Sequence, residues 1–264
     1  MYRITPVVKN LLIINVSLFL ATYLLGFQFR FDLMKVLAMY YPASEHFQPY
    51  QFVTHMFMHG GMMHIFFNMY ALWMFGTAIE NAWGGKRFLF YYLFTGLGAA
   101  ALHTFVNFLV FSGVASQITA FQNAPSPELF KQFVESHKSF FNQNVFDFIH
   151  QWSMSPESAG YAATALENMQ RVYQSTINIP TVGASGAVYG ILLAFGMMYP
   201  NTQLMLIIPP MPIKAKWLVV GLAVVALILG FSQPGSRIAH FAHLGGMLFG
   251  FILIRYWIVQ SRRR

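Results

Sequence analysis

Long stretches of apolar residues, separated by short polar breaks, constrain this chain more than any other feature. A helix needs roughly 20 apolar residues to cross a hydrocarbon core about 30 Å thick. Runs of this kind are found at 9–26, 62–82, 88–112, 186–199, 216–231 and 238–259, the fourth being shorter than the others. Because lipid cannot satisfy exposed backbone groups, each run must be helical. The sequence therefore predicts an all-α membrane protein with a bundle of six transmembrane helices.

Composition agrees with this prediction and excludes several classes of site. Only 9% of the residues are charged, whereas a soluble domain carries about 25%. The chain has no cysteine, which excludes disulfides, thiol nucleophiles and zinc sites built from thiolates. The net charge is +8, but the basic residues do not form a face with interleaved aromatics. A lipid bilayer is therefore the expected partner and nucleic acid is not.

The distribution of basic residues predicts the orientation of the bundle. Lysine and arginine are enriched in cytoplasmic loops, and the side that holds both termini has ten of the 16 basic residues against one acid, Glu80. The N- and C-termini are therefore expected in the cytoplasm. The first span follows Arg3 and Lys9 without a small-residue cleavage pattern, so we expect a retained helix. An Arg- and Ser-rich mitochondrial presequence is missing, which favours the bacterial inner membrane.

One long polar segment, 113–180, interrupts the apolar pattern and is expected on the outer side. It divides the chain into residues 1–112 with the first three spans, the helical insertion 113–180, and residues 181–264 with the last three spans and a basic tail. The insertion packs on the bundle, lies in the membrane interface, or serves to gate substrates or dock a partner. Its sequence leaves these possibilities open.

Two helix starts and one amphipathic pattern are visible inside the insertion. Ser126-Pro127-Glu128 and Ser155-Pro156-Glu157 each place a capping serine before a first-turn proline and an acid, which is typical of a helix N-terminus. Apolar residues then recur over 129–149 with a period close to 3.6. This pattern predicts one amphipathic helix.

The short fourth run places a serine inside the membrane. At 1.5 Å per residue, about 14 residues cover roughly two thirds of the hydrocarbon core, so the helix begins below the membrane surface. Its first backbone N–H groups need partners that lipid cannot supply. We therefore expect residues 180–185 to line a water-accessible cavity walled by protein, with Ser185 between Gly183 and Gly186 at its edge.

Polar residues in two other spans supply the groups that a serine nucleophile needs. His243 in the last span offers a general base, and no acid lies at a comparable depth, so a Ser/His dyad without a carboxylate is expected. Tyr189, one turn after Ser185, can stack on this imidazole. His64 and Asn68 share a face of the second span and can present donors together.

The glycines and each polar residue also have a purely structural interpretation. Gly183 and Gly186 let the backbone approach a substrate and free the Ser185 amide, but Gly-Ala-Ser-Gly runs are also common helix-packing surfaces in membranes. A lone intramembrane histidine or asparagine can join two helices. Polar groups on three separate spans favour one buried catalytic site.

The order of these motifs resembles the rhomboid family of intramembrane serine proteases. The chain has His-x-x-x-Asn in the second span, Gly-x-Ser-Gly at the start of a short fourth, and Ala-His-x-x-Gly-x-x-x-Gly in the sixth. The resemblance covers about 8–112 and 180–259 and leaves the insertion unmatched. It implies a six-helix rhomboid-like bundle that cleaves single-span membrane proteins near or within their transmembrane segments, without a metal or other cofactor.

Carried over by motif, the resemblance implies a role for each of these residues. Ser185 would be the nucleophile and His243 the base, with His64, Asn68 and the Ser185 amide as the oxyanion hole. Tyr189 would support the histidine, and His59 would stabilise the first outer loop. The residues His240 and His243 are three apart, but only His243 is followed by glycines three and seven residues later.

Two other functions are consistent with parts of the sequence. A non-catalytic rhomboid-like protein would bind membrane clients without cutting them, although such relatives typically lack the serine or the histidine. The methionines and histidines of 55–64 suit Cu(I), although methionine is also a common apolar filler.

Tyr50-Gln51 departs from the Trp-Arg that the family often has in the first outer loop. Substrate preference and oligomeric state are left open.

Overall fold

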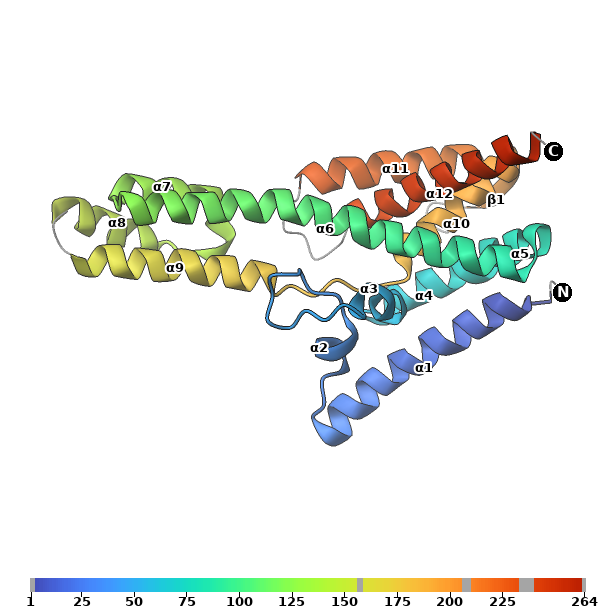
Figure 1. Cartoon of the computed structure of the whole chain (residues 1–264), viewed down its shortest axis with the longest axis horizontal. Helices are drawn as coiled ribbons and strands as arrows, with labels where there is room; N and C mark the ends of the chain where they lie inside the picture. The colour runs from blue at the N-terminus through green and yellow to red at the C-terminus, as the bar shows by residue number, and fades with distance from the viewer. Residues whose placement is uncertain (1–2, 156–158, 206–209, 233–239, 263–264) are drawn as a thin grey trace. The chain divides into compact units, whose positions relative to one another are not determined.

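The computed structural model describes residues 3–155, 159–205, 210–232 and 240–262, and most of them are helical (Figure 1). Within these ranges, five helices are long and apolar enough to cross a membrane: α1 (Pro6–Phe29), the helical stretch Met62–Trp83, α6 (Gly85–Asn123), α11 (Ala215–Ser232) and α12 (His240–Arg262). A shorter apolar helix, α10 (Ser185–Met198), lies between α6 and α11 in the sequence. The prediction of a largely helical membrane protein is thus confirmed, and the count of six spans stays a prediction.

The chain forms two compact units. The first consists of residues 1–42, 46–105 and 180–264, and the second of residues 43–45 and 106–179. The first unit contains every residue that was predicted from the sequence to form the catalytic site. The predicted division at residues 112 and 180 stays a prediction.

A π-helical turn divides the second membrane helix. It consists of α4 (Met62–Ala71), the π turn η2 (Leu72–Gly76) and α5 (Thr77–Trp83). Gly84 then has φ +80°, a left-handed value that glycine adopts without strain. This residue ends α5 and lets the chain turn directly into α6.

Glu80 in α5 caps the N-terminus of α1. Its two carboxylate oxygens accept the backbone N–H groups of Val7 at 3.0 Å and Val8 at 2.9 Å, and the side chain is only 4% exposed. These N–H groups have no partner within their own helix, and a negative charge is favourable at a helix N-terminus. Glu80 therefore ties the first membrane helix to the second.

We expect Glu80→Ala to lower the free energy of unfolding by about 2–4 kcal/mol, because two buried donors lose a charged acceptor. Denaturant unfolding of the detergent-solubilised chain, followed by circular dichroism, measures this loss. Glu128→Ala is the matched control, since Glu128 is an exposed acid in the first turn of α7 (Pro127–Ser136) and should contribute about 1 kcal/mol or less. Equal losses in the two variants would contradict the capping role.

Glycines allow α10 to lie very close to α6 and α12. A Cβ on Gly246 of α12 would overlap the backbone carbonyl oxygen of Gly186 in α10. On the other side, a Cβ on Gly190 would lie 2.7 Å from Cβ of Thr95 in α6. The Tyr91 hydroxyl of α6 also donates to the Gly190 carbonyl at 2.8 Å. The helix that begins with Ser185 is thus held between two neighbours by near-backbone contacts.

Short elements connect the membrane helices within the first unit. The first loop contains α2 (Leu33–Leu37), α3 (Gln51–Thr54) and the 3-10 turn η1 (His55–Phe57). After α10, β1 (Gln203–Met205) and β2 (Pro212–Lys214) pair antiparallel, with Gln203 opposite Lys214. These elements were not expected from the sequence.

The second unit is a separate helical cluster with its own apolar core. Besides the end of α6 it contains α7, the 3-10 turn η3 (Lys138–Phe140), α8 (Asn144–Met154) and α9 (Ala159–Ile177). The helix start at Ser126 is confirmed, because the Ser126 hydroxyl accepts the Leu129 N–H at 3.2 Å. The second expected start, Ser155-Pro156-Glu157, lies largely outside the described residues.

The prediction of one amphipathic helix over 129–149 was wrong. The structure has two helices, because His137 leaves the helical region with φ −127° and ψ 34°. The Asn142 side chain then accepts the Asn144 N–H at 3.1 Å, a local bond that competes with a continuous helix. The 3.6 period persists across the break because both helices bury their apolar faces in the same core, which includes Phe130 and Ile149.

Candidate active site

Ser185 and His243 are in hydrogen-bonding contact although they lie 58 residues apart. Ser185 is the first residue of α10, and His243 lies in the first turn of α12. The distance from Ser185 Oγ to His243 Nε2 is 2.9 Å, and both side chains are half-buried. The geometry suits a serine hydroxyl that donates to an unprotonated Nε2, which is the arrangement that activates a nucleophile.

Tyr189 covers one face of the histidine. Its ring is stacked on the His243 imidazole with a centroid separation of 4.1 Å and an interplanar angle of 6°. Tyr189 follows Ser185 by four residues, so both side chains leave α10 on the same face. The imidazole is therefore confined to one plane in front of the serine.

The His64 ring lies beside the backbone that leads into Ser185. Gly183 has φ +123°, and a Cβ at this position would lie 2.8 Å from Cε1 and 2.9 Å from Nε2 of His64, and 3.5 Å from Ser185 Oγ. The Gly60 N–H donates to His64 Nδ1 at 3.3 Å. Only glycine fits at 183, both for its backbone angles and for the ring that it faces.

The other sequence-predicted residues lie next to this group. The Asn68 side chain is buried, and its amide donates at 2.8 Å to the His64 carbonyl of its own helix. The His59 ring lies edge-on to the His64 ring at 5.2 Å. His240 is buried, with its ring 6.2 Å from that of His243. The structure therefore groups the side chains of Ser185, His243 and Tyr189 with the ring of His64, and it directs the Asn68 amide to the backbone.

The segment before Ser185 is held in place by contacts that were not predicted from the sequence. Thr181 and Met39 exchange two backbone hydrogen bonds of 2.8 and 2.9 Å, and the Gly183 N–H donates to the His55 carbonyl at 2.9 Å. His103 of α6 contacts the Thr181 hydroxyl through Nε2 at 3.0 Å. An intramembrane imidazole at position 103 is itself a signal of a polar site, but its partner cannot be read from the sequence.

Histidines in the loop between α1 and α4 are held neutral by burial. Burial lowers the pKa of His55 to about 4, and this effect outweighs the hydrogen bonds with the Gln51 and Phe52 backbone, which raise the pKa. The pKa of His59 is also lowered to about 4, first by burial and then by the neighbouring His64. Both side chains are nearly inaccessible to solvent. The folded chain therefore binds fewer protons at these positions than an unfolded chain, in which a histidine has a pKa of about 6.5.

We expect the chain to lose stability as the pH falls from about 6.5 toward 4, because protonation then favours the unfolded state. The contribution of these two residues should be fully present above pH 6.5. Thermal unfolding in detergent between pH 4 and pH 8 measures it. His59→Phe should flatten the profile, whereas His150→Phe, which replaces an exposed histidine of α8, should not. A profile unchanged by His59→Phe would contradict this assignment.

Among the residues that the structure describes, no three His, Asp or Glu side chains are placed to hold one ion. In the segment considered for Cu(I), Met58 is buried whereas Met62 and Met63 are exposed. These thioethers do not share one environment.

Comparison with known proteins gives this geometry a family context. The family model of the Rhomboid domain matches residues 46–146 and 143–260, which is most of the chain. The chain belongs to the rhomboid family. With its apolar helices, this membership makes it an integral membrane protein.

The chain is also similar to individual rhomboid proteins over a shorter stretch. It is 34% identical over 82 residues to rhomboid protease GlpG from two strains of Klebsiella pneumoniae, a match that covers 31% of this chain and 29% of the relative. It is 32% identical over 82 residues to rhomboid protein 1, mitochondrial, of Saccharomyces cerevisiae, which covers 31% of this chain and 23% of that protein. The matched rhomboid segment thus spans less than a third of each relative.

Proposed function

We propose that this chain is an intramembrane serine endopeptidase that uses Ser185 and His243 as a catalytic dyad. The observation that carries this proposal is the 2.9 Å separation between Ser185 Oγ and His243 Nε2. Membership of the rhomboid family and the similarity to proteins named rhomboid protease support it. A non-catalytic rhomboid-like protein that only binds membrane clients is the alternative, and it gives no reason for a paired serine and histidine.

In the proposed reaction, Ser185 Oγ attacks the carbonyl carbon of a peptide bond while its proton passes to His243 Nε2. The negative charge that develops on the carbonyl oxygen is stabilised by donors aimed at it. The Ser185 amide at the start of α10 supplies one. His64 supplies another through Nε2–H, since its Nδ1 accepts the Gly60 N–H. Asn68 Nδ2 uses one of its two N–H groups on the His64 carbonyl, and the second N–H would complete this group.

Collapse of the tetrahedral intermediate breaks the C–N bond, and His243 returns the proton to the leaving amine. The first product departs and leaves an ester on Ser185. Water then gives a proton to His243 and attacks the ester carbonyl. The second collapse breaks the bond to Ser185 Oγ, which recovers its proton, and releases the acid product. No metal or organic cofactor takes part in these steps.

The substrates we propose are single-span membrane proteins, cut near or within their transmembrane segments. Support comes from the helix that carries Ser185, which is apolar and has only 14 residues, so the hydroxyl would lie below the surface of a bilayer. We also propose six membrane spans, an outer helical insertion at 113–180, cytoplasmic termini and a bacterial inner-membrane location. The excess of Lys and Arg on one side supports the orientation.

A cleavage assay in reconstituted vesicles tests the proposed activity. Wild type should cut a model single-span substrate and react with a fluorophosphonate probe, whereas Ser185→Ala should do neither. Ser17→Ala is the matched control, because Ser17 is exposed on α1 and should leave both readouts unchanged. Equal product from wild type and Ser185→Ala would end the protease proposal and favour the client-binding alternative.

A further inference from the structure

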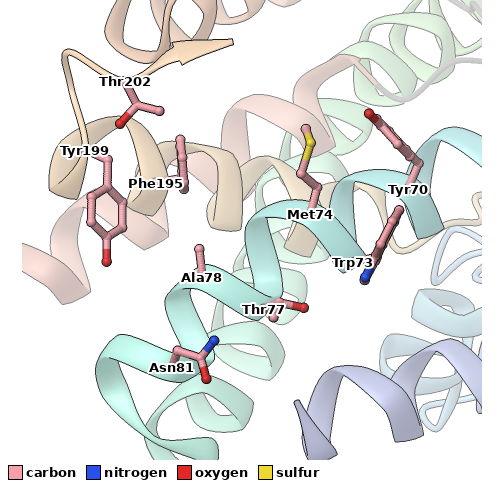
Figure 2. Close-up of a pocket in the computed structure, with 9 residues that line it drawn as sticks. All are labelled: Tyr70, Trp73, Met74, Thr77, Ala78, Asn81, Phe195, Tyr199 and Thr202. Atoms are coloured by element: carbon pink, nitrogen blue, oxygen red, sulfur yellow. The ribbon is translucent and has the colours of Figure 1, made fainter. Parts of the chain in front are cut away.

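A cavity of about 550 Å³ lies in the first unit, between the second membrane helix and the C-terminal end of α10 (Figure 2). Tyr70, Trp73 and Met74 line it from α4 and η2, and Phe195 lines it from α10. Its volume falls in the range of about 300–1,000 Å³ that is usual for small-molecule sites. The cavity uses none of the residues proposed for catalysis.

The two ends of this cavity differ in character. Figure 2 shows Tyr70, Trp73 and Met74 gathered at one end, and Asn81, Tyr199 and Thr202 at the other. The first group offers mainly ring and thioether surface, and the second offers an amide and two hydroxyls. An amphiphile fits this gradient, with its apolar chain toward η2 and its polar group toward Thr202.

Two lysines lie next to the polar end. The Thr202 carbonyl accepts the Ala215 N–H at 2.9 Å, and the Pro200 carbonyl accepts the Lys216 N–H at 3.2 Å. Lys214, on the other side of Ala215, is paired opposite Gln203 of β1. Both lysine side chains are exposed, and no carboxylate is among the residues described as lining the cavity. The backbones of two exposed lysines therefore lie beside the polar end, and the Lys216 ammonium lies 5.6 Å from the centroid of the Trp217 ring.

The wall formed by Trp73 and Met74 belongs to the π turn η2. A π turn inserts an extra residue into a helix, and such turns are rare but frequent at functional sites. Here the turn directs two large side chains toward the apolar end of the cavity. The irregularity of the second membrane helix thus coincides with the cavity.

We propose that this cavity binds one acyl chain of an anionic phospholipid, with the phosphate headgroup near Lys214 and Lys216. The aromatic end accommodates the chain, the hydroxyls of Tyr199 and Thr202 meet the ester region, and the lysines neutralise the headgroup. A bound lipid would bridge the second membrane helix and α10. Binding of this lipid does not require protease activity.

Native mass spectrometry of the full chain, titrated with phosphatidylglycerol or phosphatidylcholine of identical acyl chains, tests the site. A lysine near an anionic lipid contributes about fivefold in affinity, so the pair predicts a preference of roughly 30-fold for phosphatidylglycerol. Lys214→Gln with Lys216→Gln should reduce this preference to nearly one. The matched control, Lys131→Gln with Lys138→Gln, removes two exposed lysines of the second unit and should leave it unchanged.

A variant that fills the cavity provides a second, independent test of the proposal. Ala78 lines the cavity, and Ala78→Phe should lower the retention of both lipids by tenfold or more. Circular dichroism verifies the fold of each variant, and if Ala78→Phe fails to fold, the exposed lysine variants decide. Equal retention of the two lipids by wild type, or a preference that survives loss of both lysines, would overturn the proposal. So would undiminished retention by a folded Ala78→Phe variant.

Discussion

Replacing His243 with alanine is expected to lower substrate turnover by about 10⁴-fold or more, which is the scale seen when a serine hydrolase loses its base. The Ser185 hydroxyl lies 2.9 Å from Nε2 of this ring, its proposed proton acceptor. Without the ring, the alcohol has to ionise unaided. The KM should change little, because the imidazole acts on the reacting hydroxyl rather than on substrate held in the membrane. Initial rates of cleavage in vesicles measure both constants.

His240→Ala is the matched control for this prediction. Its ring is buried and lies 6.2 Å from that of His243, nearly perpendicular to it. Removal of this second imidazole should change kcat by about tenfold or less, because it acts only through the position of its neighbour. Comparable losses from His240→Ala and His243→Ala would contradict the assignment of the base.

The second large effect is expected from Gly246→Ala. The added methyl group would overlap the Gly186 carbonyl oxygen, and a backbone atom cannot move aside as a flexible side chain can. Separating α10 from α12 should cost about 3 kcal/mol of stability, since overpacked cores typically lose 1–3 kcal/mol and occasionally more. Gly246 follows His243 by three residues, so the shift should also move the imidazole from Ser185 and slow cleavage by about 10²-fold.

Gly221→Ala makes the same chemical change where there is room for it. Gly221 lies in α11, and a Cβ there would meet nothing within 4 Å. Alanine is a better helix former than glycine by about 1 kcal/mol, so this variant should be as stable as wild type or slightly more stable. Denaturant midpoints and cleavage rates for the two variants separate the effect of the close contact from the effect of losing a glycine. If both variants behave alike, α10 and α12 are not packed as described.

The sequence was most informative where local pattern and chemistry agree. The apolar runs located the long helices, and the glycines around Ser185 marked a place of close backbone approach. The shortness of α10 also followed from its apolar run, since the run at 186–199 nearly matches Ser185–Met198. Each of these features depends on residues that are neighbours in the chain, so a single sequence is enough to detect them.

Several features that depend on distant segments, and that no motif marks, were not predicted. Glu80 was considered only as the one acid on the side that holds both termini, because its two N–H partners in α1 are 72 and 73 residues away. The pairing of Met39 with Thr181 joins two segments that have no strand-like pattern of their own. The π turn η2 and the paired strands β1 and β2 likewise have no period that distinguishes them from helix or loop. The apolar period also gave a wrong prediction at His137, because two helices that bury their apolar faces in one core show the same period as a single helix.

The length of α10 has a consequence for the membrane around it. With 14 residues, this helix extends about 21 Å, compared with about 30 Å for an average hydrocarbon core. A bilayer with longer lipid tails would carry Ser185 deeper below the headgroups and lengthen the route for hydrolytic water. Thinner bilayers would have the reverse effect, since mismatch is accommodated by local thinning or tilting. Hydration of Ser185, the proposed nucleophile, is thus expected to depend on the thickness of the surrounding bilayer.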